Sequence, residues 1–237
     1  MLVLRGDGRC LRIGHRGAAA VAPENTLPGL EAAVEAGVDV VELDVVSLGG
    51  KLVLGHSLRE VPDDRVTLDQ ALAILAAAEV GVHVDVKVKG SEHAIAEAIL
   101  RHGLAERTYV SAFWPTTLRR FAEVAPELPR ALSYPEDRVG VSRSRALGPL
   151  TIVGAAALRR ALPRRIVGML TGARATLASL HHAVVSPATI ERCHAAGFPV
   201  LVWTVDDPVL IRKLDLLGVD AIVSNDPKML AVTLAAA

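Results

Sequence analysis

The stretch GVDVVELDVVSLGGKLVLGH, residues 37–56, contains the pattern from which the fold can be worked out. Within it, VVELDVV alternates an apolar row with two carboxylates, Glu42 and Asp44. Successive side chains of a β-strand point to opposite faces, so the carboxylates share one face and the valine and leucine side chains share the other. A strand covered on both faces usually reads as an almost continuous apolar run. The two carboxylates therefore predict a buried strand with one polar face, and the polar face is expected to have a functional role.

Short β-branched runs alternate with Ala- and Leu-rich amphipathic runs along the rest of the chain. Helical patterns separate the strands, including one or two helices between about 147 and 179, where Pro163 interrupts the pattern. Eight strands, each followed by a helical pattern, predict an α/β fold, a single (β/α)8 TIM barrel, with residues 1–237 forming one domain. A doubly wound open sheet would also fit, but the chain has no G-x-G-x-x-G turn. The strands are expected at 10–15, 38–46, 82–88, 107–113, 129–134, 181–186, 199–206 and 221–225, with a further extended piece at 51–57.

Composition excludes several classes of protein. Lys+Arg and Asp+Glu both number 26, so the net charge of +0 gives no reason to expect a nucleic-acid partner. The two cysteines, Cys10 and Cys193, are too few for a disulfide framework or a thiolate metal site. No apolar run reaches the length of a signal peptide or a membrane span, so we expect a cytoplasmic protein without a transmembrane segment. Nothing in the composition indicates an oligomeric state.

The strand VHVDVKV, residues 82–88, repeats the alternation of polar and apolar side chains. Its valines form one row, and His83, Asp85 and Lys87 form the other. In a barrel, alternate residues of each strand face the interior and the others pack against the helices. Because the apolar rows must face the helices, the polar rows of both strands are expected to face the interior near the C-terminal strand ends, where barrel active sites are built.

Three carboxylates, Glu42, Asp44 and Asp85, are thus expected in one confined space, where they would repel one another. A divalent cation would compensate their charge, and all-oxygen ligands suit Mg²⁺, Ca²⁺ or Mn²⁺ rather than Zn²⁺. The alternative is an ion-pair network of these carboxylates with Lys87 and Arg16.

Two histidines are expected at the same end of the barrel. His15 and Arg16 close the first strand, and the extended piece KLVLGHS brings in His56. A cation together with Arg16 and Lys87 suits an anionic phosphate. Histidine titrates near neutrality and suits general acid and base catalysis, so this set favours attack at phosphorus.

The ordered set of motifs resembles the glycerophosphodiester phosphodiesterase family, and the resemblance covers essentially the whole chain. The motifs that carry it are GHRG (14–17), APENT (22–26), VELDV (41–45), GHS (55–57), VDVK (84–87), VLVWTVDD (200–207) and GVDAIVSNDP (218–227). The resemblance implies hydrolysis of glycerophosphodiesters, small-molecule substrates, to an alcohol and glycerol 3-phosphate on a (β/α)8 barrel.

The resemblance also implies roles for individual residues. Glu42, Asp44 and Asp85 would bind a divalent cation, and His15 and His56 would be the acid–base pair. Arg16 and Lys87 would hold the phosphate, Trp203 would line the glycerol side of the pocket, and Asn25 could contact the phosphate. The glycerol 2-hydroxyl would attack phosphorus, and water would then open a cyclic phosphate. For Trp203 the alternative is core packing, and for Asn25 it is capping of the following helix.

Three departures from the family pattern stand out. The third carboxylate is Asp85 where glutamate is usual, so the side chain is shorter by about 1.5 Å. Residues 57–66 form a very short insertion after strand two, which suggests an open mouth and a bulkier substrate. Ser57 follows His56 where aspartate is usual, which removes a contact that would orient the histidine.

Five further residues have expected positions relative to the pocket. Glu24 is expected to pair with Arg16, and Ser111 either lines the pocket or ends its strand. His83 is expected to be a buried core histidine. His181 and His182 are expected to open strand six at its N-terminal end, away from the site.

Three other functions remain open from the sequence. A lysophospholipase D-type enzyme would use the same chemistry on lipid substrates, and an exposed apolar patch at the mouth would favour it. A second possibility is a barrel that binds a phosphate ligand without turnover. The third is a metal-assisted enzyme acting on a carbonyl substrate, which leaves the two histidines less well explained.

Overall fold

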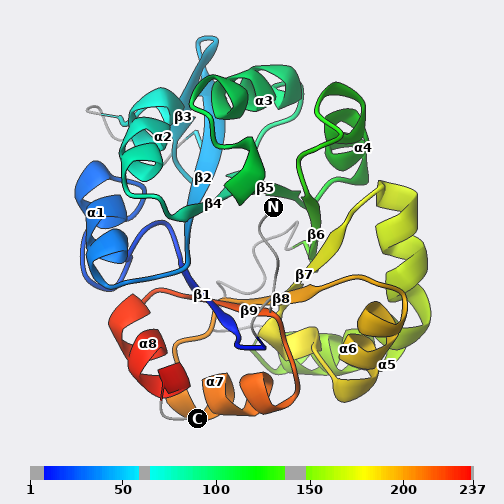
Figure 1. The fold of residues 1–237 in the computed structure, drawn as a ribbon. Helices are drawn as coiled ribbons and strands as arrows, with labels where there is room; N and C mark the ends of the chain where they lie inside the picture. The colour runs from blue at the N-terminus through cyan, green and yellow to red at the C-terminus, as the bar shows by residue number, and fades with distance from the viewer. Residues whose placement is uncertain (1–7, 59–64, 137–147, 236–237) are drawn as a thin grey trace.

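The computed structural model describes residues 8–58, 65–136 and 148–235, and it shows a closed barrel of eight parallel strands (Figure 1). β1 pairs with β9 on one side and with β2 on the other, which closes the ring. The barrel strands are β1 (Leu11–Gly14), β2 (Val40–Leu48), β4 (Gly81–Val86), β5 (Thr108–Ala112), β6 (Arg130–Tyr134), β7 (Leu177–His181), β8 (Val200–Trp203) and β9 (Ala221–Ser224). The predicted (β/α)8 barrel is confirmed.

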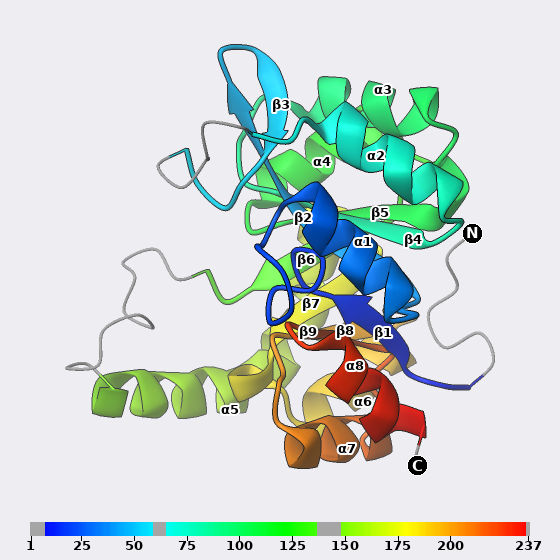
Figure 2. The same cartoon turned by 90° about the vertical axis from the view of Figure 1, so that its left-hand side faces the viewer.

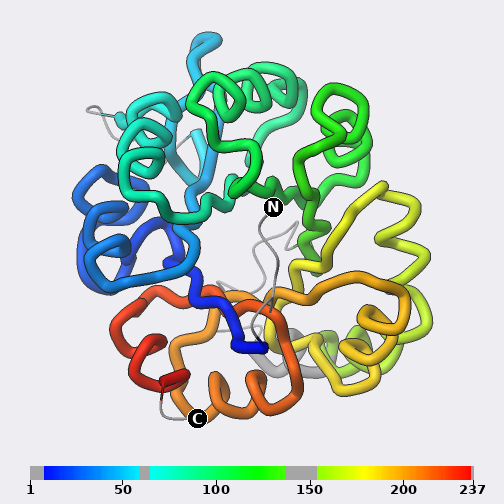
Figure 3. The backbone as a smooth tube through the Cα atoms, in the orientation of Figure 1, coloured from blue at the N-terminus to red at the C-terminus, as the bar shows by residue number. Residues whose placement is uncertain are grey.

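Helices form an outer ring around the strands, as the backbone trace in Figure 3 shows. They are α1 (Leu27–Glu35), α2 (Leu68–Ala77), α3 (Glu92–Arg101), α4 (Pro115–Val124), α5 (Gly148–Ala173), α6 (Pro187–Ala195), α7 (Pro208–Leu216) and α8 (Pro227–Ala235). Proline is the first residue of four of them, a position where its missing N–H costs no helical hydrogen bond. No helix in the described ranges is both long and apolar enough to cross a membrane.

The extended piece predicted after the Gly-Gly turn is β3 (Lys51–Leu54), which pairs antiparallel with β2. This hairpin projects beyond the barrel, and α5 extends outward on the same side (Figure 2). The region predicted as one or two helices is the single helix α5, which contains Pro163. The part of the expected short insertion at 59–64 lies outside the described residues.

The barrel interior contains a small apolar layer toward the N-terminal strand ends. It consists of Leu11, Ile13, Val40, Tyr109, Ala131, Leu177, Leu201, Ala221 and Val223, with Trp203 packed against it. Because side chains alternate along each strand, the residues two positions further along also face the interior. Those positions include Glu42, Ser111 and Ser179, so the interior changes from apolar to polar toward the C-terminal ends.

The predicted strand at 181–186 is wrong in position. β7 ends at His181, and residues His182–Val184 form a short 3₁₀-helix. The β-branched pair Val184 and Val185 suggested a strand, whereas the actual strand, LASLH, contains no β-branched residue. As a consequence, His181 and His182 lie at the C-terminal end of the barrel and not at its N-terminal end.

Candidate active site

Three carboxylates converge at the C-terminal ends of β2 and β4. Asp44 and Asp85 are register partners on these adjacent strands, and Glu42 lies one inward position below Asp44. Oxygen atoms of all three lie within 4.8 Å of one another. Burial, with the charges of Asp44 and Asp85, raises the pKa of Glu42 well above its usual value. This acidic cluster, predicted from the sequence, could hold a metal ion.

Two cationic side chains pair with carboxylates of the acidic cluster. Lys87 Nζ lies 3.0 Å from Asp44 Oδ1 and forms a close ion pair with Asp85. Arg16 Nε lies 2.8 Å from Asp44 Oδ2, and its Nη1 donates to Glu24 at 2.8 Å, which confirms the predicted Arg16–Glu24 pair. Burial alone would raise the pKa of Asp44, but Lys87 and the other cationic neighbours lower it well below its usual value. The ion-pair network considered as the alternative to a metal site is therefore present.

The acidic cluster fits a hard divalent cation by its donors. Only oxygen ligands are offered, which is the donor set that Mg²⁺ and Ca²⁺ prefer. Asp44 Oδ1 is buried and accepts no hydrogen bond from the described residues; its neighbour is the Lys87 ammonium. Burial and the charges of Asp44 and Asp85 disfavour the ionised form of Glu42, and a divalent cation bound there would favour that form.

His15 is oriented by a residue from the opposite end of the chain. Its Nδ1 lies 2.6 Å from Asn225 Oδ1, and the amide of Asn225 is fixed because its Nδ2 donates to Asp206 Oδ2 at 2.6 Å. The amide oxygen can only accept, so Nδ1 of His15 carries the proton. Its Nε2, 4.0 Å from Glu42 Oε2, then has a free lone pair. Burial and the neighbouring Arg16 lower the pKa of His15, which favours this neutral form.

His56 lies beside Asp44 of the acidic cluster. Its Nδ1 is 2.8 Å from Arg16 Nη2 and 3.3 Å from Asp44 Oδ2. The guanidinium can only donate, so an Nδ1 that accepts from it leaves the proton of the imidazole on Nε2. The contacts of the two rings with Asn225 and Arg16 thus favour opposite tautomers, with a free lone pair on His15 and an N–H on His56. Arg16 and Asp44 hold the ring, although Ser57 replaces the expected aspartate.

The loop between β1 and α1 is shaped by Gly17, whose φ is +86°. A Cβ atom on Gly17 would collide with the backbone of Gly29, so only glycine fits this close approach. The turn brings the backbone N–H of Arg16 to 2.7 Å from Glu42 Oε2, where it donates a hydrogen bond. Asn25 lies in the same loop, where its Oδ1 accepts from the Asp44 N–H at 3.0 Å and its Nδ2 lies 3.2 Å from Asp44 Oδ2.

Capping of α1 by Asn25, the alternative considered from the sequence, is wrong. Thr26 is the N-cap, and its side chain accepts from the Gly29 N–H at 3.2 Å. The buried Asn25 instead orients Asp44 within the acidic cluster.

Asp85 is held by a buried hydrogen-bonded chain. Ser111 Oγ donates to Asp85 Oδ1 at 2.6 Å, and His83 Nε2 lies 2.7 Å from Ser111 Oγ. Since the serine hydroxyl is used as a donor to the carboxylate, His83 must donate from Nε2. Burial lowers the pKa of His83 to about 4, and its ring stacks on Tyr109 at 4.3 Å. The prediction of a buried His83 is confirmed, and Ser111 faces the site.

Aromatic side chains line the mouth across from the acidic cluster. Trp203, at the end of β8, contacts Phe113 edge-on at 6.0 Å and His181 edge-on at 5.0 Å. Trp203 is half-buried, so it packs against the interior layer and also borders the mouth. The Lys87 ammonium lies 5.5 Å from the centre of the Phe113 ring. The charged residues of the site are therefore in contact with its aromatic residues.

Four residues of this arrangement were not predicted as site residues: Asn225, Asp206, His181 and Phe113. Asn225 and Asp206 lie within motifs noted in the sequence, but their pairing with His15 depends on barrel closure. His181 was missed because its strand was misplaced by four residues.

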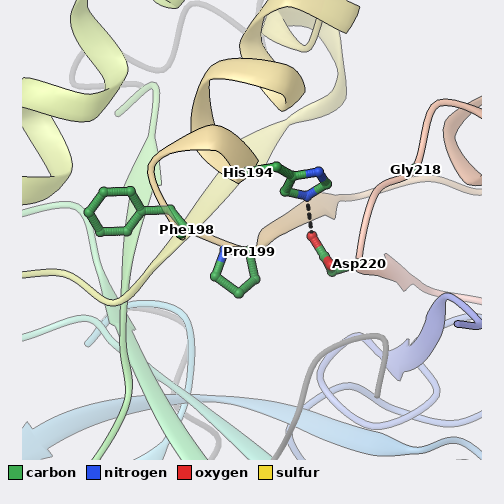
Figure 4. Close-up of a pocket in the computed structure, with 6 residues that line it drawn as sticks. His194, Phe198, Pro199, Gly218 and Asp220 are labelled. Carbon is green, nitrogen blue, oxygen red and sulfur yellow. Dashed lines mark hydrogen bonds and ion pairs between the residues drawn. The ribbon is translucent and has the colours of Figure 1, made fainter. Parts of the chain in front are cut away.

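A second hollow lies at the opposite, N-terminal end of the barrel (Figure 4). It has a volume of about 480 Å³ and is lined by His194, Gly197, Phe198, Pro199, Gly218 and Asp220. His194 Nε2 lies 2.8 Å from Asp220 Oδ2, which also accepts from the Val200 N–H. The polar groups of His194 and Asp220 therefore have hydrogen-bond partners within the hollow. In barrel enzymes, residues at the N-terminal end of the strands contribute to the stability of the fold.

The fold and the site define a (β/α)8-barrel hydrolase with acidic, cationic and imidazole groups gathered at the C-terminal strand ends. Residues 15–71 and 57–229 match the model of the glycerophosphoryl diester phosphodiesterase family. The chain belongs to this family, whose members are phosphoric diester hydrolases. The predicted family and enzyme class are thereby confirmed.

Individual relatives are similar over almost their whole length. A glycerophosphodiester phosphodiesterase of Caldanaerobacter subterraneus is 24% identical over 261 residues, covering 94% of this chain and 96% of the relative. A crystal structure of a glycerophosphodiester phosphodiesterase from Parabacteroides distasonis superposes with a TM-score of 0.75 at 20% identity, covering 96% of this chain and 98% of that one. An Oleispira antarctica phosphodiesterase in complex with the product sn-glycerol-3-phosphate superposes with a TM-score of 0.72 at 21% identity, covering 96% and 97%.

Proposed function

We propose that this protein hydrolyses glycerophosphodiesters to an alcohol and glycerol 3-phosphate. Glu42, Asp44 and Asp85 would hold one divalent cation, Mg²⁺ or Ca²⁺, with Mn²⁺ as a further candidate. When bound, such a cation polarises a phosphoryl oxygen and offsets the charge that develops in the transition state. The observation that carries the proposal is the placement of His15 and His56 beside the acidic cluster, with Nδ1 of His15 at Asn225 Oδ1 and Nδ1 of His56 at Arg16 Nη2, contacts that favour opposite tautomers.

His15 would act as the general base and His56 as the general acid. The free Nε2 lone pair of His15 accepts the proton of the glycerol 2-hydroxyl as that oxygen attacks phosphorus. The Nε2–H of His56 donates to the oxygen of the leaving alcohol as its bond to phosphorus breaks. The cyclic phosphate so formed is then opened by water, with the two histidines exchanging roles.

Arg16 and Lys87 would bind the phosphate. Lys87 forms an ion pair with Asp44 and donates a hydrogen bond to Asp85, and an ammonium has three N–H donors, so donor capacity remains for a phosphoryl oxygen. Asp44 and Asp85 raise the pKa of Lys87, against the effect of its burial, so it stays charged. Trp203 would border the glycerol, and Asn25 would act by orienting Asp44.

The test is release of glycerol 3-phosphate from glycerophosphocholine with EDTA, with Mg²⁺ and with Ca²⁺. We expect turnover only with a cation, and a loss of roughly 10²- to 10⁴-fold in kcat for His15→Ala and for His56→Ala. His93→Ala, on the exposed surface of α3, is the matched control and should keep full activity. Cation-independent turnover, or full activity of both site variants, would contradict the proposal.

A lysophospholipid is the second candidate substrate. Val21, in the loop after β1, and Leu58, after β3, are large exposed apolar side chains on loops at the mouth side of the barrel. They suit contact with an acyl chain. The same assay on lysophosphatidylcholine separates this substrate from the small diester, and binding without turnover of either would indicate a barrel that only binds phosphate ligands.

A further inference from the structure

His181 lies at the mouth of the barrel, directly across from the acidic cluster. It is the last residue of β7 and the register partner of Trp203 on β8. Leu177 belongs to the interior apolar layer, so the alternation of the strand turns Ser179 and then His181 toward the interior as well. Around the ring β7 is the fourth strand from β2 in either direction. A substrate whose phosphate lies against β2 therefore presents its far end to His181.

A backbone N–H two residues after His181 determines which nitrogen of the His181 ring carries the proton. The N–H of Ala183 donates to Nδ1 at 3.2 Å. An Nδ1 that accepts leaves the proton of the neutral ring on Nε2. Burial, together with the neighbouring His182, lowers the pKa of His181 to about 4, so the ring is neutral at physiological pH. No described residue accepts a hydrogen bond from Nε2, and the imidazole thus offers an unused N–H donor.

The neighbours of His181 restrict the group that this donor can bind. Trp203 packs edge-on against it at 5.0 Å, and the buried Nε1 of Trp203 is likewise without a partner among the described residues. An uncharged donor beside an aromatic ring suits a neutral oxygen acceptor. The ammonium groups of choline and ethanolamine offer no acceptor, so the donor suits the glycerol side of the diester and not these head groups.

We propose that His181 is a specificity-determining residue whose Nε2–H binds the terminal hydroxyl of the substrate's glycerol, the hydroxyl farthest from phosphorus. The inference rests on the proposed phosphodiesterase function. The 2-hydroxyl is the attacking group at the acidic cluster, so the terminal hydroxyl is the one that reaches across the mouth. A site with an otherwise unpaired donor selects ligands that carry the matching acceptor.

The test compares glycerophosphocholine with the phosphocholine diester of propane-1,2-diol, which keeps the attacking hydroxyl and lacks the terminal one. We expect wild-type kcat/KM to be about 10-fold higher for the glycerol diester, the size of one uncharged hydrogen bond. His181→Phe keeps a ring and removes the donor, so the ratio between the substrates should fall to about 1, as in a double-mutant cycle. His181→Gln restores an N–H donor and should recover part of the ratio. His93→Phe is the surface control and should keep the wild-type ratio.

The outcomes separate this inference from the proposed function. Turnover of both diesters by the wild type without discrimination, or an unchanged ratio in His181→Phe, overturns the role of His181 and leaves the hydrolysis intact. If the wild type hydrolyses neither diester, the proposed function fails. The role of His181 is then tested by calorimetry, which compares the affinity for sn-glycerol 3-phosphate with that for propane-1,2-diol phosphate. A His181-dependent preference for the glycerol ligand supports the inference, and equal or absent binding overturns it.

Discussion

The Nδ1 atom of His15 lies 2.6 Å from the Oδ1 atom of Asn225, although 210 residues separate the two in the chain. His15 follows β1 and Asn225 follows β9, and these strands are adjacent because the barrel closes between them. Asp206 fixes the amide, accepting from Asn225 Nδ2 at 2.6 Å and from its backbone N–H at 2.8 Å. Closure of the barrel thus sets which nitrogen of His15 holds a proton.

Removal of the amide in Asn225→Ala should impair the base without unfolding the barrel. The His15 ring loses its fixed tautomer, so we expect kcat to fall by about 10- to 100-fold with little change in KM. Nitrogen NMR of the His15 ring should show the proton moving in part from Nδ1 to Nε2. Ser224→Ala removes another hydrogen bond to Asp206 and leaves the contact with His15 intact, so it is the matched control. An Asn225→Ala enzyme with wild-type kcat would show that the amide does not orient the base.

Ser111 should control the affinity for a cation through Asp85. Its hydroxyl donates to Asp85 Oδ1 at 2.6 Å, and Ser111→Ala leaves this oxygen and the His83 N–H without their hydrogen-bond partner, while Asp85 Oδ2 keeps its pair with Lys87. Outer contacts of this kind typically contribute about 10- to 100-fold to metal affinity, and we expect a loss in that range for Mg²⁺ or Mn²⁺ measured by calorimetry. Ser133→Ala, a buried inward-facing serine on β6, is the control. Equal losses in the two variants would argue against a specific role for Ser111.

Lys87 should stabilise the metal-free protein by balancing the acidic cluster. Lys87→Met leaves the buried Asp44 without its ammonium partner at 3.0 Å. Removing one member of a buried pair costs about 3 to 5 kcal/mol, so the free energy of unfolding in urea with EDTA should fall by that amount. A divalent cation should then raise the melting temperature more in the variant than in the wild type, because the two cations compete for the same carboxylates. Lys89→Met, whose ammonium lies over Trp114, should show neither effect.

The polar half of the site could be predicted from the sequence because it depends on local alternation. A period of two in VVELDVV and VHVDVKV is enough to place Glu42, Asp44, Asp85 and Lys87 on the inner face of adjacent strands. His15, Arg16 and His56 follow from their position just after strand ends. These residues meet in the structure as the pattern predicts.

The residues that were missed depend on longer-range geometry. Asn225 reaches His15 only through barrel closure, and no local pattern indicates that these two side chains would form a hydrogen bond. The opposite histidine tautomers result from hydrogen bonds to Asn225 and Arg16. β7 was misplaced because its Ala- and Ser-containing sequence continues the composition of α5, whereas Val184 and Val185 have higher β-propensity. Residues 177–181 form a strand because they pair with β6 and β8 in the barrel, and this pairing cannot be read from local sequence.

Acid should weaken the barrel at the seam where β1 meets β2. Asp39, just before β2, accepts from the Arg12 backbone N–H at 2.8 Å and from the Arg9 guanidinium at 2.7 Å. Burial alone would raise the pKa of Asp39, but these hydrogen bonds outweigh it and lower the pKa to about 2. A carboxyl with a folded pKa below its unfolded value stabilises the fold above the unfolded pKa, and that contribution is lost as pH falls through the folded pKa.

The Asp39 contribution should therefore be complete at neutral pH and disappear between about pH 4 and pH 2. Asp39→Asn should lower the free energy of unfolding at pH 7 by about 1 to 2 kcal/mol, since the side chain is mostly buried but Arg9 is half exposed. The difference between wild type and variant, measured by urea unfolding at a series of pH values, should shrink toward zero as the pH approaches 2. Asp69→Asn is the matched control, because Asp69 pairs with Arg101 on the exposed surface and should change stability by less than about 1 kcal/mol. A constant difference between wild type and Asp39→Asn from pH 7 to pH 2 would show that the amide disturbs the seam sterically and that the charge of Asp39 does not stabilise it.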